Sequence, residues 1–147
     1  MIYLGIDVGK SGAMAALDET GCPFDNGIFK LDATDHDIAE WLWMVCEWGD
    51  VRACIEKVHS SPQMGVVSAF SFGRSLGYLM GLLAAVKIPY DEVSPQKWQK
   101  AMGCLSKGDK NVTKGRAQQL WPRAKCTHAI SDAMLIAEYC RLNKKTP

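Results

Sequence analysis

The sequence predicts an α/β domain built around a mixed sheet. The pattern of its first thirty residues predicts three strands joined by glycine and polar turns, which is typical of an antiparallel meander. The remainder alternates short apolar strands with helical patterns, as in folds with parallel strand pairs. With 147 residues, 48% of them hydrophobic, the chain suits a single core and is too apolar to be disordered. We therefore expect one domain over residues 1–147.

The meander is predicted by alternation and glycine punctuation. Apolar and polar residues alternate over 2–7, two glycines interrupt the run, and a second apolar segment follows at 13–17. A polar turn at 18–21 separates it from a third strand expected at 27–31.

A helix and a buried strand come next. Thr34 or Asp35 can cap the helix, whose apolar residues recur at helical spacing until Gly49 and Asp50 end it. Residues 51–56 are short, apolar and bounded by turn formers, which predicts a buried strand.

The next segment contains a long helix, a strand and a short helix. Residues 65–86 follow an apolar helical pattern with many glycines and serines, so this helix can pack closely against another. A strand is expected over 89–93. Ser94 and Pro95 then form a helix start, with proline at the first helical position and Met102 near the end.

Two further helices are expected towards the C-terminus. A loop rich in glycine and lysine covers 104–111 and leads into a basic amphipathic helix that ends at Trp121 and Pro122. The last helix is expected over 129–142.

Charge is distributed unevenly along the chain. Residues 1–92 contain 6 Lys and Arg against 13 Asp and Glu, a net charge of −7, whereas residues 93–147 contain 11 against 3, a net charge of +8. A basic region of this size can neutralise phosphates, while an acidic region repels them unless metal ions intervene. A solvated surface of one sign explains the same numbers equally well.

Two negative features bear on compartment and cofactor. No basic leader precedes an apolar stretch, and we expect no segment with the roughly 20 apolar residues of a membrane helix, which predicts a cytoplasmic protein with no membrane partner. The 6 cysteines contain no CxxC pair and are expected to be reduced thiols. Cys126 and His128 lack the further ligands of a structural zinc site.

Three carboxylates stand where a core should be apolar. Asp7 ends the first strand, Glu56 ends the fourth, and Asp132 lies near the start of the last helix. Buried together they would repel and take up protons, whereas a divalent cation among them removes this cost. Oxygen ligands favour magnesium or manganese, and two such ions about 4 Å apart can hydrolyse a phosphodiester. Taken singly, each acid is equally well explained as a capping residue or a surface ion pair.

Six segments together resemble the RuvC-type Holliday-junction resolvases of the ribonuclease H-like superfamily. GIDVGKSGAMAAL is similar to their first motif, ACIEKVHSSP to their second acidic strand, and SDAMLIAEYC to the helix with their last aspartate. SFGRSLGYLMGLLAA resembles their dimer-forming helix, and VSPQKWQKAMG and GDKNVTKGRAQQLWP resemble their connecting region. The resemblance covers nearly the whole chain and is typical of phage and bacterial members.

The resemblance implies a ribonuclease H-like five-stranded sheet flanked by helices, and a homodimer that nicks four-way DNA junctions symmetrically with magnesium, for which manganese can substitute. By motif position Asp7 bridges two ions, with Glu56 and Asp132 completing the site. It also implies the cytoplasm of a bacterium or of a phage-infected host.

The fourth ligand of the family pattern is missing. It lies three residues before the last aspartate, where this chain has Ala129, while His128 lies four before it. If the last helix already includes His128, the side chain shares a face with Asp132 and can act as ligand or general base. A solvent-exposed loop histidine is the equally weighted alternative.

DNA contacts are expected in the basic region and after Glu56. Lys107, Lys110 and Lys114 are candidates for phosphate contacts, although surface lysines are usually only solvated. Phe70 and Phe72 can stack in an opened junction or pack in the core.

Three other functions remain open from the sequence. A flap or RNA–DNA hybrid nuclease uses the same type of metal site, and a junction-binding module without chemistry needs only the fold. The D-x-G-x-S-G run also resembles the phosphate loop of actin-like nucleotide-binding proteins, but those require two such lobes. We therefore expect no nucleotide cofactor.

Overall fold

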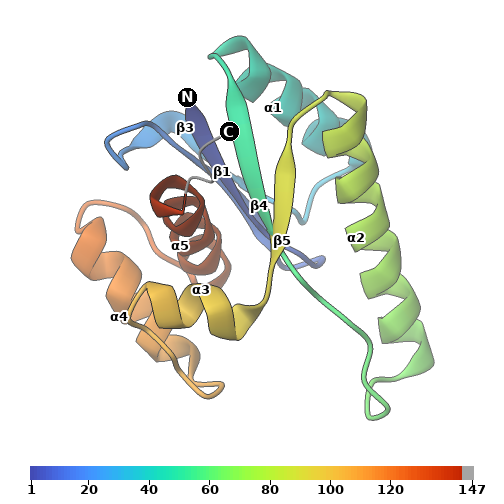
Figure 1. Ribbon diagram of the computed structural model, residues 1–147. Helices are drawn as coiled ribbons and strands as arrows, with labels where there is room; N and C mark the ends of the chain where they lie inside the picture. Colours follow the sequence, from blue (N-terminus) through green and yellow to red (C-terminus); the bar gives the residue numbers. More distant parts are fainter. Residues whose placement is uncertain (144–147) are drawn as a thin grey trace.

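A five-stranded mixed sheet forms the centre of the structure, a computed structural model that describes residues 1–143 (Figure 1). Its strands are β1 (Ile2–Asp7), β2 (Ala13–Leu17), β3 (Pro23–Lys30), β4 (Val51–Glu56) and β5 (Tyr90–Val93). They lie in the order β3-β2-β1-β4-β5. The meander pairs antiparallel, and β4 and β5 continue the sheet in parallel. The expected α/β fold with a mixed five-stranded sheet is confirmed.

Helices cover both faces of this sheet, with two on one side and three on the other (Figure 1). They are α1 (Asp35–Glu47), α2 (Val66–Ala85), α3 (Pro95–Ala101), α4 (Lys110–Leu120) and α5 (His128–Leu142). Helices α1 and α2 pack on the first face, and α3, α4 and α5 pack on the second. The sheet is thus buried on both sides, as the apolar strands predict.

Alternation along β1 distributes its side chains between the two layers. Tyr3 belongs to the core beneath α5, whereas Leu4 and Ile6 belong to the core beneath α1 and α2. Between them Gly5 allows α5 to lie directly on the strand, because a Cβ there would be 2.1 Å from the Ala133 carbonyl oxygen. This contact fixes α5 over the C-terminal half of β1.

Several element boundaries differ by a residue or more from the sequence prediction; β3, α4 and α5 begin earlier than expected. Strand β3 begins at Pro23, before the 27–31 segment expected, because polar residues and a proline are tolerated on an edge strand. Helix α5 begins at His128, one residue earlier than expected, with Thr127 as N-cap accepting a hydrogen bond from the Ile130 amide.

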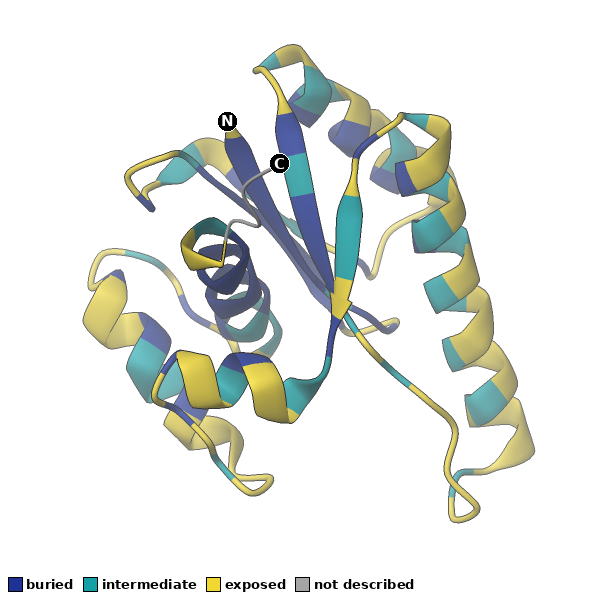
Figure 2. Ribbon diagram, viewed as in Figure 1, coloured by how far each residue is buried: buried dark blue, intermediate teal, exposed yellow. Residues whose placement is uncertain are grey.

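Helix α2 packs on the sheet through only part of its surface. Leu79 and Leu83 are buried, while Val66, Val67 and Phe70 are exposed (Figure 2). Its 20 residues are long and apolar enough to cross a membrane by length and composition, so the sequence expectation that no such segment exists is wrong on that criterion. The two buried leucines nevertheless place one side of α2 in the core of the domain.

Candidate functional site

The three predicted carboxylates line one cleft at the C-terminal ends of β1 and β4. Because these strands are parallel neighbours, Asp7 and Glu56 end at the same edge of the sheet. Asp132 reaches this edge from the second turn of α5, which lies on β1 and β4. The cleft has a volume of about 720 Å³ and is lined by all three acids and by His128 and Lys110. The tertiary structure therefore brings together residues that are far apart in sequence.

Asp7 is the most strongly perturbed acid of the cleft. Burial raises the pKa of its carboxyl from 3.8 to about 8, and repulsion from Glu56 and then Asp132 adds to the increase. Lys110 acts in the opposite direction. Without a further positive charge, Asp7 therefore holds a proton at neutral pH.

Glu56 is held by a hydrogen bond that the sequence did not predict. The indole Nε1 of Trp98 donates to Glu56 Oε2 over 2.7 Å. Burial raises the pKa of Glu56, the Trp98 hydrogen bond lowers it, and repulsion from Asp132 raises it again. In the sequence, Trp98 is one apolar residue of the helical pattern of α3. No local sequence signal indicates its contact with Glu56, which lies 42 residues earlier in the chain.

Asp132 has a buried oxygen without a hydrogen-bond partner. Among the described residues it is the single buried side chain with such an atom, Oδ1. Burial raises the pKa of Asp132, while the Thr113 hydroxyl, Lys110 and His128 lower it. A buried oxygen of this kind is costly unless a ligand or ion satisfies it.

His128 satisfies the geometric condition set by the sequence. Because α5 includes it, His128 lies one turn before Asp132 and lines the same cleft. Its ring remains exposed, and Nδ1 lies 3.2 Å from the carbonyl oxygen of Lys110. The exposed ring is accessible to a ligand in the cleft.

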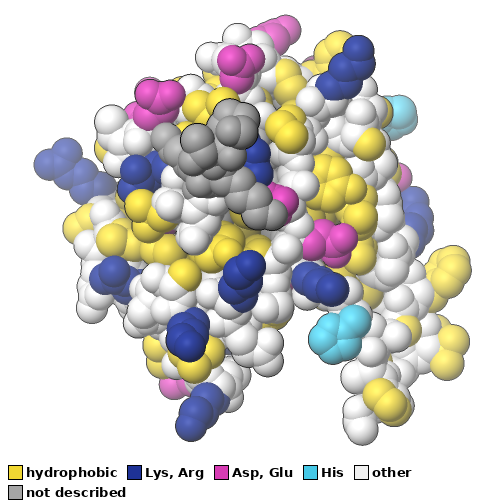
Figure 3. Space-filling model, viewed as in Figure 1, with side chains coloured by type: hydrophobic (Ala, Val, Ile, Leu, Met, Phe, Trp, Pro, Cys, Tyr) yellow, Lys and Arg dark blue, Asp and Glu magenta, His cyan; other side chains and the backbone are white. Residues whose placement is uncertain are grey.

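Two of the three predicted lysines lie at the cleft or at a hollow beside it, and the third lies at neither. Lys110 lines the carboxylate cleft, and Lys107 and Lys110 line an adjoining hollow of about 500 Å³ that also contains Glu56 and Asp132. Lys114, one turn further along α4, lines neither. Figure 3 shows Lys and Arg side chains gathered over the α3 and α4 side of the molecule.

Helix α2 forms the opposite wall of the cleft. Serines and the half-buried Phe72 face it from the N-terminal half of this helix. The Phe72 ring lies against Gly9, whose Cβ, if present, would be 3.3 Å from Cε2. Phe70 is 77% exposed, so core packing is wrong for this residue. Its stacking on DNA stays a prediction.

The chemistry of the donor set fits a hard divalent cation. In residues 1–143 no three His, Cys, Asp or Glu side chains are close enough to hold a metal ion as they stand. However, Glu56 and Asp132 raise the pKa of Asp7, Asp132 raises the pKa of Glu56, and one buried oxygen of Asp132 has no partner. Acids that repel one another are expected to stay apart until a cation draws them together.

Solved structures of RuvC share this fold. Thermus thermophilus RuvC has 15% sequence identity and a TM-score of 0.67, covering 93% of this chain and 91% of its own. Thermus thermophilus RuvC in complex with a Holliday junction substrate has 15% identity and a TM-score of 0.65, covering 97% and 96%. No family model matches the chain, and no curated protein matches its sequence. The fold is thus RuvC-like at a low level of identity.

Proposed function

We propose that this protein is a metal-dependent, structure-selective DNA endonuclease that resolves four-way junctions by paired nicks. One observation supports this most strongly: Asp7, Glu56 and Asp132 converge on a single cleft of a RuvC-like fold, beside Lys107 and Lys110. Carboxylates that can hold cations, next to lysines that can contact phosphates, are suited to phosphodiester hydrolysis.

Magnesium is the proposed cofactor, with two ions held by Asp7, Glu56 and Asp132 and manganese as a substitute. When bound, the ions activate water and stabilise the leaving oxygen of the phosphodiester. The protein contributes the orientation of its ligands. Trp98 holds Glu56 through its indole N–H, and burial of Asp132 Oδ1 without a partner leaves that oxygen available to a cation.

His128 and Lys110 are proposed to act on the substrate side of the cleft. His128 is exposed within reach of a bound phosphate or water, so it can accept a proton from the attacking water or serve as an additional ligand. Lys110 lowers the pKa of both Asp7 and Asp132 and can contact a phosphate oxygen.

A homodimer through α2 is proposed to pair two clefts. Paired nicks require two active sites related by a twofold axis. The outer surface of α2 supports this, because a Cβ added at Gly73, Gly77 or Gly81 would meet no neighbouring element within 4 Å and the helix exposes apolar side chains. A dimer interface would bury the exposed apolar side chains of α2 without a membrane. We therefore propose a cytoplasmic location.

A panel of labelled DNA substrates tests the proposed activity. Four-way junction, flap, RNA–DNA hybrid and linear duplex are incubated with the protein in magnesium, manganese or EDTA. We expect metal-dependent nicking with four-way junction strongly preferred. Preference for flap or hybrid would assign a different nuclease on the same fold, and nucleotide binding by calorimetry without cleavage would favour the actin-like alternative.

Amide substitutions then test the roles of the acids. Asp7→Asn, Glu56→Gln and Asp132→Asn should each abolish cleavage, because removing ligand charge weakens cation binding, while junction binding persists through phosphate contacts. Binding is measured in calcium. Glu92→Gln, at an exposed position on β5, is the matched control. Near-normal cleavage by Asp7→Asn would refute the metal site.

A further inference from the structure

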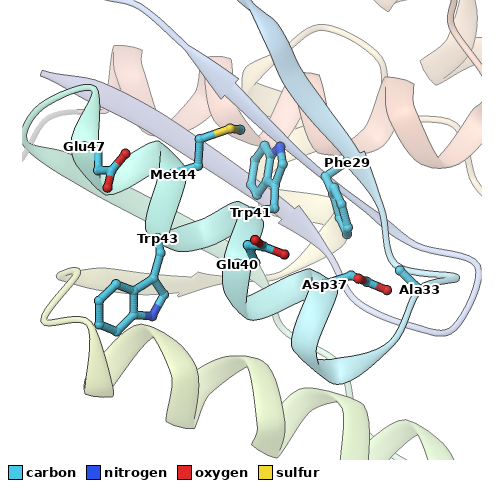
Figure 4. Close-up of a pocket in the computed structure, with 8 residues that line it drawn as sticks. All are labelled: Phe29, Ala33, Asp37, Glu40, Trp41, Trp43, Met44 and Glu47. Carbon is cyan, nitrogen blue, oxygen red and sulfur yellow. The ribbon is translucent and has the colours of Figure 1, made fainter.

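A groove lined by aromatic and acidic residues lies along α1 (Figure 4). We call it the α1 groove; it has a volume of about 700 Å³ and shares no lining residue with the cleft. On its floor, Trp41 donates from Nε1 to the Asn26 carbonyl oxygen over 3.0 Å and lies 5.5 Å from the Phe29 ring. Trp43 and Met44 line it as well.

Trp43 is poorly explained by the fold alone. Its side chain is 66% exposed, whereas Trp41 on the same helix is buried. Large aromatic side chains left in water are typical anchors of protein interfaces, since burying them on binding removes much apolar surface. The exposed indole is therefore suited to anchor a binding partner.

The charge around the groove indicates what that molecule carries. Residues 32–50 contain 6 acids and no Lys or Arg, and two of these acids, Asp32 and Asp35, pair with Lys30 and Arg74 outside this range. Asp37 is committed to the capping box with Thr34, but Glu40 and Glu47 form no ion pair within residues 1–143. Glu47 also lies in the last turn of α1, where a negative charge opposes the helix dipole. Both glutamates are thus available to a cationic partner.

We propose that the α1 groove binds a protein segment in which Lys or Arg side chains alternate with apolar ones, such as a basic amphipathic helix. Apolar side chains cover Met44 and the Phe29–Trp41 pair, while cations pair with Glu40 and Glu47 or lie on the Trp43 ring. DNA and anionic membranes carry the wrong charge for this surface. The α1 groove shares no lining residue with the cleft, and α1 and α4 cover opposite faces of the sheet (Figure 1), so a partner on α1 leaves the lysines of α4 accessible.

Synthetic peptides of defined composition test the proposal by fluorescence anisotropy. The probe is a labelled helical peptide with a leucine face and a lysine face. Two matched peptides replace every lysine by glutamate or every leucine by serine. We expect the leucine–lysine peptide to bind at least about tenfold more tightly than either, because the groove requires both charge and apolar contact. Equal binding of the serine–lysine peptide would reduce the groove to a nonspecific acidic surface and overturn the proposal.

Substitutions in the α1 groove test whether the leucine–lysine peptide binds there. Trp43→Ser and the double variant Glu40→Lys/Glu47→Lys should each weaken binding about tenfold or more, while the charge-reversal control Glu92→Lys should not. All these positions are at the surface, and circular dichroism checks that the variants fold. Unchanged affinity in both groove variants would overturn the proposal.

Two further outcomes would also overturn it. Anionic vesicles that bind the wild type and lose binding with Trp43→Ser would make the occupant a lipid surface. Salt-sensitive self-association that Glu40→Lys/Glu47→Lys abolishes, seen by light scattering, would make it a second copy. Junction cleavage should be the same in Trp43→Ser and wild type, so this test is independent of the proposed nuclease.

Discussion

At the scale of single residues, Asp7 couples the stability of the metal-free protein to pH. Its folded-state pKa of about 8 lies above the ordinary 3.8, so the folded protein keeps a proton that the unfolded chain releases. Where the folded state binds more protons, stability falls as pH rises, here between about 4 and 8. The cost of ionising Asp7 is absent at acidic pH and complete above pH 8.

Asp7→Asn should therefore stabilise the metal-free protein at alkaline pH. We expect its free energy of unfolding in EDTA to exceed that of wild type by about 2 kcal/mol or more at pH 8.5, with little difference near pH 4. Urea unfolding across this range measures the effect. A difference in free energy of unfolding that does not grow with pH would contradict the burial of Asp7 and its repulsion by Glu56 and Asp132.

Trp98 is expected to set the protonation of Glu56. Because its hydrogen bond lowers the pKa of Glu56, Trp98→Phe should raise that pKa and move the acidic limb of the cleavage profile to higher pH. Trp121→Phe is the matched control, since its Nε1 donates to the Gly21 carbonyl oxygen outside the cleft. Both variants should lose about 1 kcal/mol of stability. A profile that shifts equally in both would remove Trp98 from the site.

At the scale of elements, the contact of α5 with β1 determines where Asp132 lies. Gly5→Ala would place a methyl group 2.1 Å from the Ala133 carbonyl oxygen and 2.3 Å from the Ala137 amide nitrogen, so α5 must move away from the strand. We expect the free energy of unfolding to fall by about 3 kcal/mol and the cleavage activity to fall sharply. Gly115→Ala on α4, with open space around it, should be neutral or stabilising by about 1 kcal/mol. Equal stability of the two variants would contradict this packing.

The outer surface of α2 is the element on which dimerisation depends. Leu79 is buried against the sheet, so an arginine there disrupts the core and does not test the interface. Gly77→Arg instead projects from the open side and should convert the dimer to a monomer with unchanged circular dichroism. Light scattering measures the change. A wild-type monomer with full junction activity at the same concentration would contradict the dimer.

At the scale of the whole molecule, the uneven charge predicts a steep salt dependence of junction binding. Replacing Lys107, Lys110 and Lys114 together by alanine should lower the slope of log binding constant against log salt by about 2, since each lost phosphate contact contributes roughly 0.9 and the first two line the cleft or the adjoining hollow. Lys125→Ala, at an exposed position outside both clefts, is the control. The titration is done in calcium. An unchanged slope in the triple variant would move the DNA path elsewhere on the basic surface.

The order of the strands and helices, and the acids of the cleft, could be predicted from the sequence. Alternation, glycine turns and caps predict local structure because they depend on neighbouring residues, and Asp7 and Glu56 are visible as strand-terminal carboxylates. The edge strand β3 was the least well predicted, since its polar residues lack a strong pattern. Three features could not be predicted from the sequence: the close contact at Gly5, the hydrogen bond from Trp98 to Glu56, and the oxygen of Asp132 without a partner. Each depends on atoms brought together from distant segments, and the energies of burial, repulsion and hydrogen bonding exist only once the sheet and α5 have packed.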